Sequence, residues 1–264
     1  MIQMREPRPI DLAHARILIT NDDGVQAPGI EVLETLARQL SDDVWVVAPE
    51  TEQSATSHSL TVRRPLRMRH LGERRFSVDG TPTDSVVVAV GKVLRDRKPD
   101  LVLSGINQGS NLGEDVIYSG TVAAAMEAAL LGLPAIALSQ TRRGDHDFRW
   151  AASEAWLPSV IRTVCANGFT PDMLVNVNVP DCLPDDVRGV RVAAQGRRDV
   201  ETEVVEGVDP GGRPYLWIGD YMSDETLDPA SDLYAINEGY VSVTPLHFDL
   251  TERQRLGTLE AAFR

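Results

Sequence analysis

Two adjacent carboxylates follow an apolar run near the start of the chain. The run Ile17–Thr20 leads directly into Asn21, Asp22, Asp23 and Gly24. In an open α/β sheet, ligands bind outside the carboxyl ends of the strands, and glycine lets the chain turn there. Paired carboxylates in such a place predict a seat for a hard divalent cation. The alternative is an Asp-rich turn, because Asn, Asp and Gly also favour turns.

Other side chains with oxygen ligands follow later predicted strands. Ser54 comes after the second strand along the chain, and Asn107 comes after a later one. Together with Asp22 and Asp23, they would form a site of two carboxylates, a hydroxyl and a carboxamide. Oxygen ligands suit Mg²⁺ or Mn²⁺ better than a metal that prefers sulfur, and few protein ligands leave positions for water and substrate. We therefore expect one divalent metal ion.

A predicted helix N-terminus lies downstream of these residues. Ser119, Gly120 and Thr121 open an alanine-rich helix. Unpaired N–H groups and the positive dipole end of a helix bind phosphate, so this turn is a candidate phosphate site. Taken alone, Ser119 is better explained as an N-cap, and Asn107 and Asn111 as ordinary turn residues.

Strand-like and helix-like segments alternate through the first two-thirds of the chain, and they must position these side chains. This alternation predicts an α/β fold, a Rossmann-like and mostly parallel sheet flanked by helices, with right-handed crossovers. Strands are expected at residues 17–20, 44–48, 101–103, 135–138 and 174–179. Helices are expected at residues 28–40, 84–94, 121–131 and 150–164.

The pattern changes after Gly189. Segments 190–194, 215–218 and 240–243 have the composition of strands without long helices between them, and 207–214 is rich in turn residues. We expect a disordered or loosely docked extension at 1–15, the core at 16–189, and a C-terminal β-hairpin arm with the final segment at 190–264. Because uncovered strand edges favour pairing with another chain, the arm is expected to support a dimer or higher oligomer.

Acidic residues outnumber basic ones. The 264 residues include 26 Lys+Arg and 39 Asp+Glu, a formal net charge of −13. This charge argues against binding a nucleic-acid backbone or an anionic membrane over a broad surface, whereas a bound metal still permits a small phosphorylated substrate. Cys165 and Cys182 form neither a disulfide framework nor a cysteine zinc site. We find no stretch resembling a signal peptide or a membrane span and expect a cytoplasmic protein.

Several separate segments, in matching order, resemble the SurE (survival protein E) family of 5′/3′-nucleotidases. The similarity runs from Arg16 to about Thr251, which is nearly the whole chain. The segments that carry it are residues 21–24 with 27–29, 48–54, 80–84, 104–113, 118–127 and 240–246.

The resemblance implies a metal-dependent phosphomonoesterase that acts on nucleoside monophosphates and assembles into homodimers or homotetramers. It assigns one metal ion, Mg²⁺ or Mn²⁺, to Asp22, Asp23, Ser54 and Asn107. It places Asn111 and the Ser119-Gly120-Thr121 turn around the phosphate. Thr56 stands where a glycine is common in the family, and Gln108 and Ser110 are local variants. These departures concern substrate fit more than metal binding.

Several chemical alternatives stay open at this level. Asp22 or Asp23 would position a water or accept its proton, or one of them would form a covalent aspartyl-phosphate. His58 could protonate the leaving oxygen, although a lone histidine in a Ser/Thr-rich loop is more often solvated. Two further functions are hydrolysis of another ester or amide on the same scaffold, and nucleotide binding without catalysis.

Overall fold

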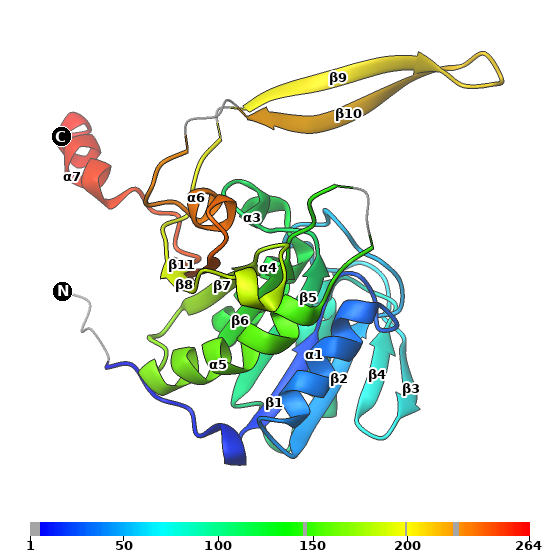
Figure 1. The fold of residues 1–264 in the computed structure, drawn as a ribbon, viewed down its shortest axis with the longest axis vertical. Coiled ribbons are helices and arrows are strands. Elements are labelled where there is room, and N and C mark those ends of the chain that lie inside the picture. The colour runs from blue at the N-terminus through cyan, green and yellow to red at the C-terminus, as the bar shows by residue number, and fades with distance from the viewer. Residues whose placement is uncertain (1–5, 145–146, 199, 224–226) are drawn as a thin grey trace.

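A mostly parallel sheet forms the centre of the molecule (Figure 1). The computed structural model describes residues 6–144, 147–198, 200–223 and 227–264. Within these residues, nine strands form the sheet in the order β3-β4-β2-β1-β5-β6-β7-β11-β8. The strands from β4 to β7 pair in parallel, while β3 and β11 run antiparallel to β4 and β7. The strands are β1 (Arg16–Thr20), β2 (Asp43–Pro49), β3 (Met68–Gly72), β4 (Arg75–Val78), β5 (Leu101–Gln108), β6 (Ala135–Gln140), β7 (Met173–Val179), β8 (Val190–Val192) and β11 (Val241–His247).

Helices cover both faces of the sheet. On one face lie α1 (Pro28–Arg38) and α5 (Ala151–Asn167), and on the other lie α2 (Pro82–Val88) and α4 (Gly120–Leu130). Strand β1 shows why both faces are buried, because Ile17 and Ile19 join the core under α1 and α5 while Leu18 joins the core under α2 and α4. The shorter helices are α3 (Asp115–Tyr118), α6 (Asp232–Asn237) and α7 (Arg253–Ala262).

Capping residues set where helix α2 begins. Helix α2 begins at Pro82, and the Thr81 hydroxyl and the Asp84 carboxylate cap each other's backbone N–H groups. The helix expected at 84–94 therefore starts earlier, and from Ala89 to Val93 it continues as a wider π-helical turn. Helix α5 runs through Pro158 and is longer than the expected segment.

The described part of the segment before β1 is docked on the core, so of the two expected states, disordered or loosely docked, it is the docked one that the structure shows. Arg8 forms an antiparallel bridge with Phe169, and the Ile10 N–H donates to the Cys165 carbonyl over 3.0 Å. Gly168 permits this approach, because a Cβ there would lie 2.5 Å from the carbonyl carbon of Arg8.

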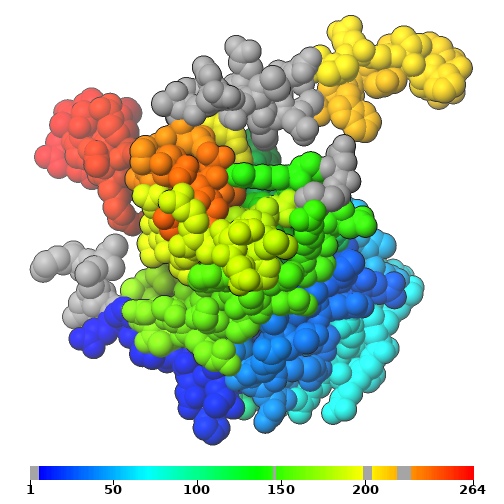
Figure 2. All heavy atoms as spheres, viewed as in Figure 1, coloured from blue at the N-terminus to red at the C-terminus, as the bar shows by residue number. Residues whose placement is uncertain are grey.

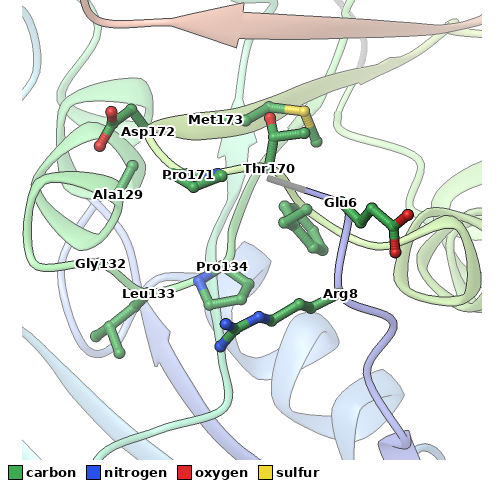
Figure 3. A pocket seen from close by; sticks show the side chains of 11 residues that line it. Glu6, Arg8, Ala129, Gly132, Leu133, Pro134, Thr170, Pro171, Asp172 and Met173 are labelled. Carbon is green, nitrogen blue, oxygen red and sulfur yellow. The ribbon is translucent and has the colours of Figure 1, made fainter. Parts of the chain in front are cut away.

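This docked segment also lines a cavity of about 300 Å³ (Figure 3). Glu6 and Arg8 form one wall, and Pro134 and Met173 contribute from the starts of β6 and β7. The cavity therefore lies at the amino ends of the parallel strands, at the opposite edge of the sheet from the residues expected to do chemistry.

A two-stranded arm stands away from the body of the molecule (Figures 1 and 2). Strands β9 (Val200–Val208) and β10 (Pro214–Ser223) pair antiparallel; β10 contains the strand expected at 215–218, whereas β9 was not expected. By contrast, β8 and β11 belong to the main sheet. Among the described residues, none of the helices has the length and apolar character that crossing a bilayer requires.

Candidate active site

Three adjacent strands bring the predicted metal ligands to one edge of the sheet. Strand β1 lies between β2 and β5, and Asp22, Ser54 and Asn107 lie at or beyond their carboxyl ends. The chain leaves β1 toward β2 on one side and later returns to β5 on the other. Such a reversal of strand order is where open α/β sheets bind ligands.

Asp22 is buried against the start of α4. Its side chain is 4% exposed, and the Thr121 hydroxyl donates to Asp22 Oδ1 over 2.5 Å. Gly120 is required here, because a Cβ on it would lie 2.7 Å from Asp22 Cβ and 3.0 Å from Asp22 Oδ2. The helix N-terminus therefore presses directly on the carboxylate that follows β1.

The surroundings of Asp22 disfavour its negative charge. The pKa of Asp22 is raised to about 6, chiefly by burial and in smaller part by the nearby Asp23 carboxylate, while hydrogen bonds from Thr121 oppose the shift. Among the residues that the structure describes, no positively charged side chain contributes to the shift at Asp22. A divalent cation would supply positive charge there.

Asp23 connects the β1 loop to β5. The Gln108 backbone N–H donates to Asp23 Oδ2 over 3.1 Å, and Asp23 is half-buried. Burial raises the pKa of Asp23, and the Glu52 carboxylate adds to this effect. The turn reading of this loop also holds, because the Asn21 side chain donates to the Gly24 carbonyl over 2.8 Å. The same loop can therefore form the turn and also provide metal ligands.

Ser54 lies in the loop after β2, which is tied to the same place. The Gln53 N–H donates to the Asp22 carbonyl over 2.7 Å. Ser54 itself is exposed, and its hydroxyl donates to Glu52 Oε1 over 2.9 Å. Glu52 therefore lies close to two predicted ligands, Asp23 and Ser54, and the sequence analysis did not single it out.

Asn107 is half-buried at the end of β5. Its amide nitrogen donates to the Gly109 carbonyl over 2.9 Å, which fixes the side chain across its own turn. The strand is irregular just before it, with a cis peptide bond between Gly105 and Ile106. Gly105 has φ +134°, and a Cβ there would lie 2.2 Å from the Leu138 carbonyl oxygen, so only glycine fits.

The residues present fit a divalent cation held by a few oxygen ligands. Among the residues that the structure describes, no three His, Cys, Asp or Glu side chains gather as a metal site. The candidate set instead combines two carboxylates, one of them buried and short of positive charge, with a hydroxyl and an amide. Hard cations accept this oxygen-only chemistry, and Mg²⁺ usually keeps several waters with few protein ligands.

The predicted phosphate residues have local structural partners. Ser119 is the N-cap of α4, and its hydroxyl accepts from the Val122 N–H over 3.0 Å. The Thr121 hydroxyl is engaged with Asp22. In this turn, the Gly120 backbone N–H is therefore the candidate donor to a phosphate oxygen.

Asn111 belongs to a buried polar network. Its amide nitrogen donates to Ser139 Oγ over 2.8 Å, and its backbone N–H donates to Asn178 Oδ1 over 2.8 Å. Its carbonyl accepts from the side chains of Asn176 and Asn178. The geometry therefore gives Asn111 a structural role in shaping the loop before α3, and its contact with phosphate stays a prediction.

Backbone groups are what the sequence analysis missed at this site. The Gln108 and Gln53 N–H groups tie the three loops together, and every residue type except proline has such a donor. No side-chain pattern could have found them. Glu52 did have a signal, a carboxylate two positions before Ser54.

The family model described as survival protein SurE matches residues 17–202 of this chain. The chain belongs to the SurE family. Two similar relatives are both named 5′-nucleotidase SurE. The protein of Paramagnetospirillum magneticum is 55% identical over 98% of this chain and 100% of its own length. That of Rhodospirillum rubrum is 53% identical over 96% of this chain and 98% of its own length.

A solved SurE structure has the same fold. The crystal structure of the SurE protein from Aquifex aeolicus superposes with a TM-score of 0.84 and is 38% identical, covering 94% of this chain and 99% of that one. The expected family membership and the expected α/β fold with a hairpin arm are therefore confirmed.

Proposed function

We propose that this SurE chain is a 5′-nucleotidase, a metal-dependent phosphomonoesterase that hydrolyses nucleoside 5′-monophosphates to nucleoside and phosphate. Relatives with that name, matched over nearly their full length, support the activity. At the site, the Asp22–Thr121 contact carries the proposal, because it joins a carboxylate pair to a helix N-terminus. Nucleoside 3′-monophosphates are a second substrate class to test.

Asp22, Asp23, Ser54 and Asn107 would hold one Mg²⁺ or Mn²⁺, which when bound supplies positive charge beside the phosphate and makes a bound water more acidic. Asp23 is the less buried carboxylate of the pair, and it would position the attacking water and accept its proton. The Gly120 N–H at the start of α4 would bind a phosphoryl oxygen.

We also propose that the protein is a homodimer or homotetramer in which the arm contacts another copy. Large apolar side chains lie exposed on the arm, with Trp217 67% and Ile218 74% accessible. Exposed apolar surface of this kind, on paired strands with free edges, favours association. No broad binding of nucleic acid is expected for a chain of net charge −13.

A substrate panel tests the activity. Phosphate release would be followed from 5′- and 3′-nucleoside monophosphates, p-nitrophenyl phosphate and a carboxyl ester, in chelator and then with Mg²⁺ or Mn²⁺ restored. We expect release from the 5′-monophosphates only with metal. Equal turnover after metal removal, or turnover confined to the carboxyl ester, would contradict the proposal.

A further inference from the structure

The loop after β2 carries Ser54 and contains two residues in an unfavourable backbone conformation. Ser54 is exposed, and its hydroxyl bonds within the loop to Glu52. Two neighbours that are not glycine, Ala55 and Ser57, have φ of 55° and 52°. This left-handed conformation is unfavourable for residues with a side chain, so contacts elsewhere must stabilise the loop.

The two ends of the loop are bonded to the Asp22 carbonyl and to the Thr81–Asp84 cap of α2, and its middle, residues 57 and 58, contacts α3 and α4. The Ser57 N–H and hydroxyl donate to the carbonyls of Tyr118 and Ile117 over 3.1 and 2.8 Å. Beyond them, His58 Nε2 lies 2.9 Å from Glu127 Oε2 on α4. The two side chains are 31% and 14% exposed, so the hydrogen bond between them is partly shielded from water.

The same helix holds Asp22 at its other end. Thr121, in the first turn of α4, donates to Asp22, and Glu127 lies six positions further along. Helix α4 therefore connects the Ser54 loop to the first carboxylate of the candidate metal site. Fixing the loop on this helix fixes two predicted ligands relative to each other.

We propose that His58 and Glu127 are positioning residues, which clamp the Ser54 loop to α4 and thereby set the hydroxyl of Ser54 relative to Asp22. The proposal rests on the proposed metal-dependent function. It differs from a role for His58 as acid to the leaving oxygen. Six residues of helix separate Thr121 from Glu127 by about 9 Å along the axis. An acid must lie within hydrogen-bond reach of the oxygen it protonates, whereas His58 Nε2 is held at Glu127.

Hydrogen–deuterium exchange of the metal-free protein tests the clamp without any need for activity. His58→Ala and Glu127→Ala should each speed exchange across residues 54–59, and the double variant should be no faster than either single variant, since both remove one interaction. His58→Gln keeps a side-chain N–H donor and should restore slow exchange. His14→Ala, which removes a similar but exposed pair with Asp11, is the matched control and should change nothing at the loop.

Metal affinity and phosphatase activity provide a second, independent test of the clamp. His58→Ala should weaken Mn²⁺ binding by about tenfold, the scale of one charged hydrogen bond, and should slow AMP and p-nitrophenyl phosphate equally, while His58→Gln stays near the parent. Parental exchange and Mn²⁺ affinity in His58→Ala would overturn the clamp. So would a His58→Gln variant that loses turnover of AMP but keeps turnover of p-nitrophenyl phosphate, because that pattern would identify His58 as the general acid.

If His58→Ala did not fold, Glu127→Gln, which keeps the size of the side chain, would take its place. A parent that neither binds Mn²⁺ nor releases phosphate would refute the proposed function, while the exchange result would still decide the clamp.

Discussion

The Thr121 hydroxyl donates to Asp22 Oδ1 over 2.5 Å, although the two residues are 99 positions apart in sequence. This hydrogen bond joins the end of β1 to the start of α4. Asp22 is thereby presented on the positive end of a helix while it is buried beside a second carboxylate. Within the site, Asp22 is therefore the buried carboxylate and Asp23 the more solvent-accessible one.

Neutralising either carboxylate separates a metal seat from a simple turn. Asp22→Asn and Asp23→Asn preserve shape and turn preference but remove one negative charge each. We expect each to lower Mn²⁺ affinity and phosphatase turnover by orders of magnitude, while stability without metal holds or rises because repulsion within the pair is relieved. Calorimetric Mn²⁺ titration, a thermal melt and AMP turnover measure this. Unchanged turnover in both variants would overturn the assignment of this strand end.

The neutral ligands make a weaker prediction of the same kind. Ser54→Ala and Asn107→Ala remove oxygen ligands from loops at or near the surface, so folding should survive. Metal affinity should fall by about 10- to 100-fold, as is common when groups that tune a metal site are lost. A variant that binds Mn²⁺ and turns over AMP like the parent would show that its residue only shapes a turn.

Gly120 tests the close approach of α4 to Asp22. A methyl group at Gly120 would lie 2.7 Å from Asp22 Cβ, so Gly120→Ala must displace the helix or the carboxylate. We expect turnover to fall by about a hundredfold, the cost of misplacing a reacting group by roughly 1 Å. Gly91→Ala is the matched control. It has open space around its Cβ position and an ordinary φ, and it should keep full activity.

The metal-free protein should lose stability as pH rises through the folded-state pKa of Asp22. The pKa of this carboxyl is 3.8 in the unfolded chain and about 6 in the fold, so the folded state binds the extra proton between these values. Its contribution is complete below pH 4 and is lost as pH rises through 6, which amounts to about 3 kcal/mol.

Denaturant unfolding of parent and Asp22→Asn between pH 4 and 7 measures this difference. The two proteins should be alike near pH 4, and the variant should be the more stable near pH 7. Mn²⁺ affinity of the parent should rise over the same interval, because the cation competes with the proton. A stability difference that does not vary with pH would refute the assignment to Asp22.

The arm makes a prediction about assembly. Trp217→Lys and Ile218→Lys place charge on side chains that are 67% and 74% exposed, so folding of a single copy should be unaffected. If the arm contacts another copy, light scattering should show a smaller oligomer than the parent forms. Val62→Lys, at a 75% exposed apolar residue outside the arm, should leave the oligomer intact. A monomeric parent would rule out the proposed assembly.

The sequence by itself determined the elements and the chemistry of the site. The alternation of strands and helices indicated the parallel sheet, and Ile17–Thr20 followed by two aspartates indicated an oxygen-only site, because residue type and spacing reflect local preference and burial. It also marked Ser119 as an N-cap, which the Val122 N–H confirms. It missed β9 and the docking of Arg8 on Phe169, which local pattern does not encode.

The tertiary structure alone decided which side chains meet. Strand order places β1 between β2 and β5, and only this order brings Asp22, Ser54 and Asn107 to one edge. The burial that raises the pKa of Asp22 comes from α4 packing against it. His58 read alone was a solvated or catalytic residue, and its partner Glu127 lies 69 positions away. Such contacts depend on long-range packing, and periodicity along the chain carries no information about them.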